Sequence, residues 1–212
     1  MNRHIIILLL IALFIAFAST NVLNKQYIND DVRIIYFVQR AADNNLFQND
    51  MLRSYTETAQ APVTTTLLHI YYFFVKLNID FIVLGKVLSI VLFLLSALYA
   101  YKLGSAMNKN SSFLFAMIII FWLGANWGAF SGGLSRAFGY PLFFAFLYYV
   151  IKDKNAVIGT ILILMALFYP PVLLLSLVIY SLNALQGRKF LGLIMNSILP
   201  VIILFLSFVN KK

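Results

Sequence analysis

The chain has 212 residues, of which 62% are hydrophobic and 11% are charged, and its formal net charge at pH 7 is +9. This composition excludes a water-soluble domain, and the continuous apolar runs predict an all-α, polytopic integral membrane protein. The positive charge does not predict a nucleic-acid partner, because the basic residues are scattered in pairs between apolar segments rather than clustered on one face.

The apolar runs predict about seven transmembrane helices and one shorter helix. In chain order, the predicted spans cover residues 5–22, 81–101, 113–129, 136–151, 156–169, 172–185 and 190–209. The shorter run, 63–77, is amphipathic, so we expect it to lie at the membrane interface or to dip only partly into the membrane. The chain therefore divides into a first transmembrane helix (1–23), an exported acidic loop with amphipathic helices (24–80) and a helical bundle of about six spans (81–212).

The basic residues of the short loops predict the orientation, because lysine and arginine stay preferentially on the cytoplasmic side. They recur in every second loop and before the first span: Arg3, Lys102, Lys109, Lys152, Lys154, Arg188 and Lys189. We thus expect a cytoplasmic amino terminus and an acidic loop on the non-cytoplasmic side.

Two alternatives concern the ends of the chain. The orientation places Lys211 and Lys212 outside, so we expect a longer protein, with a missing C-terminal half or a partner subunit. The first span has a second interpretation as a cleaved signal peptide, because Arg3 precedes an apolar stretch and Ala16-Phe17-Ala18 forms a cleavage pattern. The acidic loop is exported in either case.

Acidic residues gather in the polar part of this loop, up to about residue 61, which holds five of the seven in the chain: Asp30, Asp31, Asp43, Asp50 and Glu57. The adjacent pair Asp30 and Asp31 precedes an amphipathic stretch, 32–42, that is typical of an interfacial helix. Such a pair can deprotonate an acceptor hydroxyl, or hold a divalent cation such as Mg or Mn. The alternative is that the two carboxylates only cap this helix in water.

A family resemblance follows from four stretches and the order of the spans. The stretches are 26–33 after the first span, 61–62 before the short helix, 135–141 at a return turn and 168–171 at the next exported turn. Together they resemble the GT-C glycosyltransferases, which include the protein O-mannosyltransferases and the aminoarabinose transferases acting on lipid A.

This resemblance implies an enzyme that transfers a sugar from a polyprenyl-phosphate or polyprenyl-diphosphate donor to an acceptor on the non-cytoplasmic side. Asp30 or Asp31 would match the catalytic acidic position, acting as base or metal contact, and Arg136 would pair with the donor phosphate. The alternative for Arg136 is an arginine that only snorkels to the interface or sets the topology. The chain departs from the family pattern at Ala61-Pro62-Val63, where relatives often carry His-Pro-Pro, and at Leu134-Ser135, where they carry an acidic residue.

Three further residues, Asp43, Arg53 and His69, are candidate substrate contacts, with solvated loop residues and an interfacial histidine as the alternative interpretations. The glycines at 128, 132 and 133 predict a flexible or closely packed turn beside Arg136, or a phosphate-binding nest.

Two other functions remain open at this point. A transporter or lipid flippase would carry ionisable residues inside its spans, which here are almost free of charge apart from Lys86. A non-catalytic membrane protein is the other alternative.

Overall fold

The structure is a computed structural model that describes residues 3–20, 45, 65–187 and 190–209. Over these residues it is helical and contains no strand, which confirms the all-α class. The helices are α1 (Arg3–Thr20), α4 (Thr65–Lys76), α5 (Phe81–Met107), α6 (Ser112–Ala125), α7 (Ser135–Ile151), α8 (Asn155–Phe168), α9 (Pro170–Gly187) and α10 (Phe190–Val209). Two short 3₁₀ turns, η1 (Trp127–Ala129) and η2 (Ser131–Gly133), separate α6 from α7.

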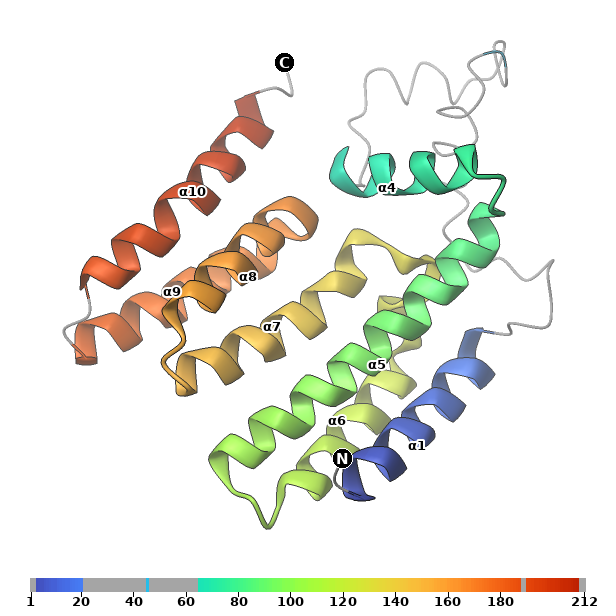
Figure 1. Cartoon of the computed structure of the whole chain (residues 1–212), viewed down its shortest axis with the longest axis horizontal. Helices are drawn as coiled ribbons and strands as arrows, with labels where there is room; N and C mark the ends of the chain where they lie inside the picture. The colour runs from blue at the N-terminus through green and yellow to red at the C-terminus, as the bar shows by residue number, and fades with distance from the viewer. Residues whose placement is uncertain (1–2, 21–44, 46–64, 188–189, 210–212) are drawn as a thin grey trace.

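The long helices lie alongside one another, and α4 lies across one end of them (Figure 1). We call this end the α4 end: it holds α4, the end of α1, the starts of α5, α7 and α9, and the two 3₁₀ turns. Ring contacts fix the pairing of the helices. Phe138 at the start of α7 stacks on Phe168 at the end of α8, with ring centroids 4.2 Å apart. At the opposite end, His4 of α1 contacts Phe113 of α6 at 5.5 Å.

A short connection fixes how α4 meets α5. Asn78 has a φ of 60°, and its N–H donates to the Val75 carbonyl at 2.9 Å, while the Ile79 N–H donates to the Phe74 carbonyl at 3.2 Å. This pair of bonds is a Schellman motif, which ends a helix at a residue in the left-handed conformation. Asp80 then caps α5 by accepting a hydrogen bond from the Ile82 N–H at 2.8 Å. The two helices are therefore joined with little freedom.

Three helices are long and apolar enough to cross a membrane: Arg3–Thr20, Phe81–Met107 and Pro170–Gly187. The number rises to four if Ser112–Ala125 and Trp127–Gly133, which are bent by 79°, form one broken span. α10 has 20 residues, but only Leu191–Leu206 of it enters this comparison, as a shorter apolar helix. The other helices are shorter; α8, for example, has 14 residues, about 21 Å at 1.5 Å per residue against a hydrocarbon core of about 30 Å. The described residues thus support three or four spans, fewer than the seven expected.

Large apolar side chains are exposed along the outer helices. Phe14 of α1 and Leu191 of α10 are each 75% exposed, and Phe205 of α10 is 67% exposed. A monomeric soluble protein rarely exposes apolar patches of this extent. The surface therefore suits contact with lipid tails.

Candidate functional site at the α4 end

Arg136 is the second residue of α7 and its side chain is exposed at the α4 end. The first turn of α7 contains no acidic residue, and the residue that precedes the helix, Leu134, provides no side-chain cap. The positive end of a helix dipole favours anions. A guanidinium in that first turn adds a full positive charge and a planar set of donors that fits phosphate. The site can thus bind an anionic group.

The turn before α7 determines where Arg136 lies. Gly132 and Gly133 both have positive φ values, 73° and 60°, a region that glycine adopts at no steric cost. A Cβ added to Gly133 would lie 2.9 Å from Cβ of Leu88 in α5. The sequence-based prediction of a closely packed turn beside Arg136 is therefore confirmed, and the turn rests directly on α5.

Ser89 of α5 bridges the backbone of this turn. Its hydroxyl accepts a hydrogen bond from the Gly133 N–H at 2.9 Å. The same hydroxyl lies 2.6 Å from the Phe130 carbonyl and 2.8 Å from the Gly85 carbonyl of its own helix, so its single proton has two acceptors within range. Because the Gly133 amide is bonded to Ser89, it is not offered to a ligand. The Gly133 amide therefore does not support the alternative prediction that this turn is a phosphate-binding nest.

Tyr71 joins α4 to the same turn. Its hydroxyl donates to the Gly132 carbonyl at 2.7 Å, and the side chain is 2% exposed. Gly85 of α5 makes this approach possible, because a Cβ there would lie 3.1 Å from the Tyr71 hydroxyl and 3.2 Å from the Gly132 carbonyl oxygen. Elements from three parts of the chain therefore meet at Gly132.

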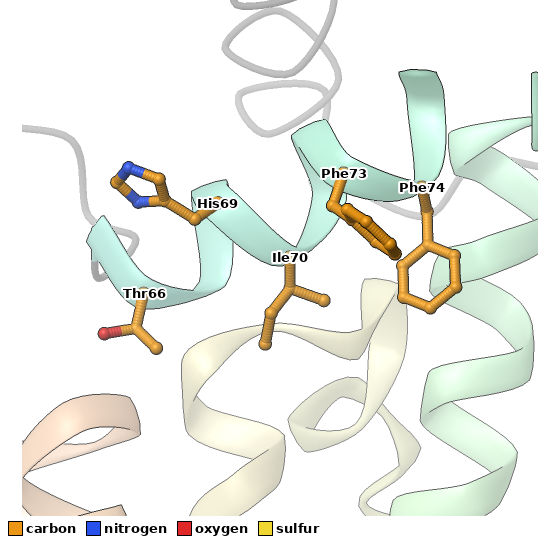
Figure 2. A pocket seen from close by; sticks show the side chains of 5 residues that line it. All are labelled: Thr66, His69, Ile70, Phe73 and Phe74. Carbon is orange, nitrogen blue, oxygen red and sulfur yellow. The ribbon is translucent and has the colours of Figure 1, made fainter. Parts of the chain in front are cut away.

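His69 lies on α4 and its side chain is exposed. With Thr66, Ile70, Phe73 and Phe74 it lines a shallow, open hollow of about 500 Å³. In Figure 2 the His69 ring projects from the upper side of α4, whereas Ile70 and Phe74 project downward, toward the helices beneath. Arg136 and His69 are the two candidate residues that the structure describes, and both belong to the α4 end.

The other candidates, Asp30, Asp31, Asp43 and Arg53, lie outside the described residues. The described residues nearest to them in the chain are Thr20, Asn45 and Thr65, and Thr20 and Thr65 both belong to the α4 end. Within 3–20, 45, 65–187 and 190–209, no group of three or more His, Cys, Asp or Glu side chains could hold a metal ion. The Mg or Mn site at Asp30 and Asp31 stays a prediction.

Sequence reasoning missed Tyr71 and Ser89. One signal was present, because Gly85 and Ser89 are four residues apart in a membrane helix. Small residues at this spacing let another backbone approach closely. The element that approaches here is the turn rather than a second long helix.

Comparison of the chain with protein-family models, with curated proteins and with solved structures gave no match. Any functional assignment therefore rests on the residues and geometry of the α4 end.

Proposed function

We propose that the chain is a membrane glycosyltransferase of the GT-C type, with about seven spans, which transfers a sugar from a polyprenyl-phosphate-linked donor on the non-cytoplasmic side. One observation carries the proposal: Arg136, in the first turn of α7, lies at the same end as Thr20 and Thr65, which flank the acidic stretch. A candidate phosphate-binding cation thus lies at the end where the described chain borders the stretch that carries the candidate carboxylates.

In the proposed reaction, Asp30 or Asp31 accepts the proton of the acceptor hydroxyl. The hydroxyl oxygen forms a bond to the anomeric carbon of the donor sugar, and the bond between that carbon and the phosphate oxygen breaks. The departing polyprenyl phosphate keeps the electron pair. Arg136 stabilises the negative charge that develops on this phosphate through charge-assisted hydrogen bonds.

The charge distribution supports the proposed orientation. At the end opposite α4, the described basic residues are Arg3, Lys102, Lys109, Lys152 and Lys154. Basic residues that flank membrane spans favour the cytoplasm. We therefore assign the opposite end to the cytoplasm, and the α4 end to the side where polyprenyl-linked sugars would be used.

The test measures binding of a polyprenyl phosphate to the full chain in lipid nanodiscs. The chain has two tryptophans, and Trp122→Phe leaves Trp127, in the turn before Arg136, as the single fluorescent reporter. In this background Arg136→Gln should weaken binding about 10- to 100-fold, because a hydrogen bond to a charged group contributes about 1.5–3 kcal/mol.

Lys76→Gln is the matched control. It removes one positive charge from the same end, where the Lys76 ammonium lies 4.4 Å from the centre of the Tyr72 ring. Lys76→Gln should bind polyprenyl phosphate like the parent. A polyprenol without the phosphate group should bind to the parent and to Arg136→Gln with equal affinity. If Arg136→Gln and Lys76→Gln lost affinity equally, Arg136 would contribute only to the net positive charge of this end, and the assignment would be overturned.

A second variant separates chemistry from binding. With a panel of polyprenyl-phosphate hexoses and pentoses as donors, the double variant Asp30→Asn with Asp31→Asn should lose sugar transfer at least about 100-fold, since the general base is gone. It should still bind polyprenyl phosphate. Transfer at the parental rate in the double variant would refute the assignment of these two residues.

A further inference from the structure

We infer that Tyr71 and Ser89 are positioning residues, which hold the turn at 127–133 and thereby set where Arg136 meets the donor phosphate. This inference rests on the proposed function, because it assigns the two hydroxyls a role at the same site. It adds a specific link between α4, which directly follows the acidic stretch in the chain, and the arginine of α7.

The first step of the argument is that the turn needs support from outside. Its last two residues, Gly132 and Gly133, have positive φ values, and glycine has more backbone freedom to lose than any other residue. Within the turn, the Gly133 N–H also donates to the Phe130 carbonyl at 3.1 Å, but this bond leaves the Gly132 carbonyl without a partner inside the turn. Partners from other elements therefore add to the turn's own bonds in fixing the observed conformation.

The second step identifies those partners. Tyr71 of α4 donates to the Gly132 carbonyl at 2.7 Å, and Ser89 of α5 accepts from the Gly133 N–H at 2.9 Å. One backbone group of each glycine is thus bonded, on two different helices. Both side chains are at most 2% exposed. If either hydrogen bond is lost, the buried partner group is left unsatisfied, which costs free energy.

The third step concerns the distance along the chain. Only Leu134 and Ser135 separate Gly133 from Arg136, and α7 already begins at Ser135. A rotation about the backbone of Gly132 or Gly133 therefore changes the direction of α7's first turn and displaces the guanidinium. Because bound phosphate requires donors within about 3 Å, a small displacement reduces affinity.

The experiment compares two variants with two matched controls, in the full chain in nanodiscs. Tyr71→Phe removes the hydroxyl that bonds the turn, and Tyr72→Phe removes a hydroxyl from the neighbouring residue while keeping the ring beneath Lys76. Ser89→Ala removes the bridge. Ser96→Ala removes an equally buried hydroxyl of the same helix, one that donates to Leu92 within that helix at 2.8 Å.

Two readouts are needed. Spin labels on cysteines at Phe73 and Gly128 report the distance distribution between α4 and the turn; the chain has no native cysteine, and the two positions are exposed. The affinity for polyprenyl phosphate is measured by Trp127 fluorescence in unlabelled protein, in which residues 73 and 128 are the native ones. Tyr71→Phe and Ser89→Ala should each broaden the distribution and weaken binding about 5-fold, the effect of one hydrogen bond of about 1 kcal/mol. Tyr72→Phe and Ser96→Ala should change neither.

The outcomes separate this inference from the proposed function. If Arg136→Gln weakens binding while Tyr71→Phe and Ser89→Ala leave affinity at the parental value, the positioning role is wrong and the proposed function stands. A broadened distance distribution with unchanged affinity also overturns it, because the hydroxyls would then be structural only. If Arg136→Gln itself binds normally, the proposed function fails. Should Tyr71→Phe fail to fold, Ser89→Ala decides.

Discussion

At the residue scale, the site depends on glycines whose roles differ. Gly133 has a φ of 60° and lies against Leu88, whereas a Cβ on Gly128 would meet no atom within 4 Å. The same substitution at these two positions therefore separates conformational strain and crowding from the general effect of losing a glycine.

Gly133→Ala should lower the free energy of unfolding by about 1–3 kcal/mol, because a non-glycine residue at positive φ is strained and the new methyl group crowds Leu88. Gly128→Ala should change it by less than about 0.5 kcal/mol. Thermal unfolding in detergent, followed by far-UV circular dichroism, measures both. Similar melting temperatures for the two variants would contradict the packing described for the turn.

The sequence alone named Arg136 as a candidate and predicted the glycine-rich turn beside it, because both are local features. It could not identify Tyr71 and Ser89 as partners of this turn. They lie 61 residues from Gly132 and 44 residues from Gly133, and such pairings follow from how helices pack. For Asp30, Asp31, Asp43 and Arg53 the prediction still stands on sequence alone.

At the element scale, a polar cluster connects α8, α9 and α10. The Tyr180 hydroxyl of α9 donates to the Asn155 side-chain oxygen of α8 at 3.2 Å, and it accepts from the Asn196 side-chain nitrogen of α10 at 2.9 Å. Gly159 of α8 makes room for this contact, because a Cβ there would lie 2.7 Å from the Asn196 side-chain oxygen. Hydrogen bonds of this kind hold membrane helices together.

Tyr180→Phe should therefore loosen α10. We expect amide hydrogen exchange in α10 to rise about 5-fold, which corresponds to roughly 1 kcal/mol of lost interaction. Tyr101→Phe is the control, because Tyr101 is also buried but its hydroxyl has no hydrogen bond in the part of the chain that the structure describes. Exchange in α10 that stays at the parental rate would refute a stabilising role for the cluster.

Apolar patterning predicted most helix boundaries to within a few residues but extended the third span too far. The run to residue 129 reads as one helix, yet α6 ends at Ala125. The aromatic residues beyond it belong to the turn: Trp127 and Phe130 each contact Phe93 of α5, with ring centroids 5.2 Å apart. Hydrophobicity reports burial, and these rings are buried by packing on α5 rather than by continuing the helix.

At the scale of the whole molecule, the two ends of the bundle differ in charge. Basic side chains are concentrated opposite α4, and we propose that this end faces the cytoplasm. Composition alone does not determine the span count, because short helices such as α8 are apolar without reaching the length of a bilayer core.

Single cysteines test this orientation in intact cells, since the native chain has none. Asn45→Cys and Gly128→Cys should react with a membrane-impermeant thiol reagent from outside, because both positions are exposed and belong to the proposed non-cytoplasmic side. Asn110→Cys, in the exposed turn between α5 and α6, should react only after the cells are opened. The reverse pattern would invert the orientation.

The central claim is that a lipid-linked phosphate binds at the α4 end, and photo-crosslinking tests it most directly. A polyprenyl phosphate with a diazirine next to its phosphate would be irradiated with the full chain in nanodiscs, and the labelled peptides mapped by mass spectrometry. We expect label in 65–76 and 127–136, and its loss in Arg136→Gln. Label confined to the opposite end, around Lys109, Lys152 and Lys154, where basic charge alone attracts phosphate, would contradict the account.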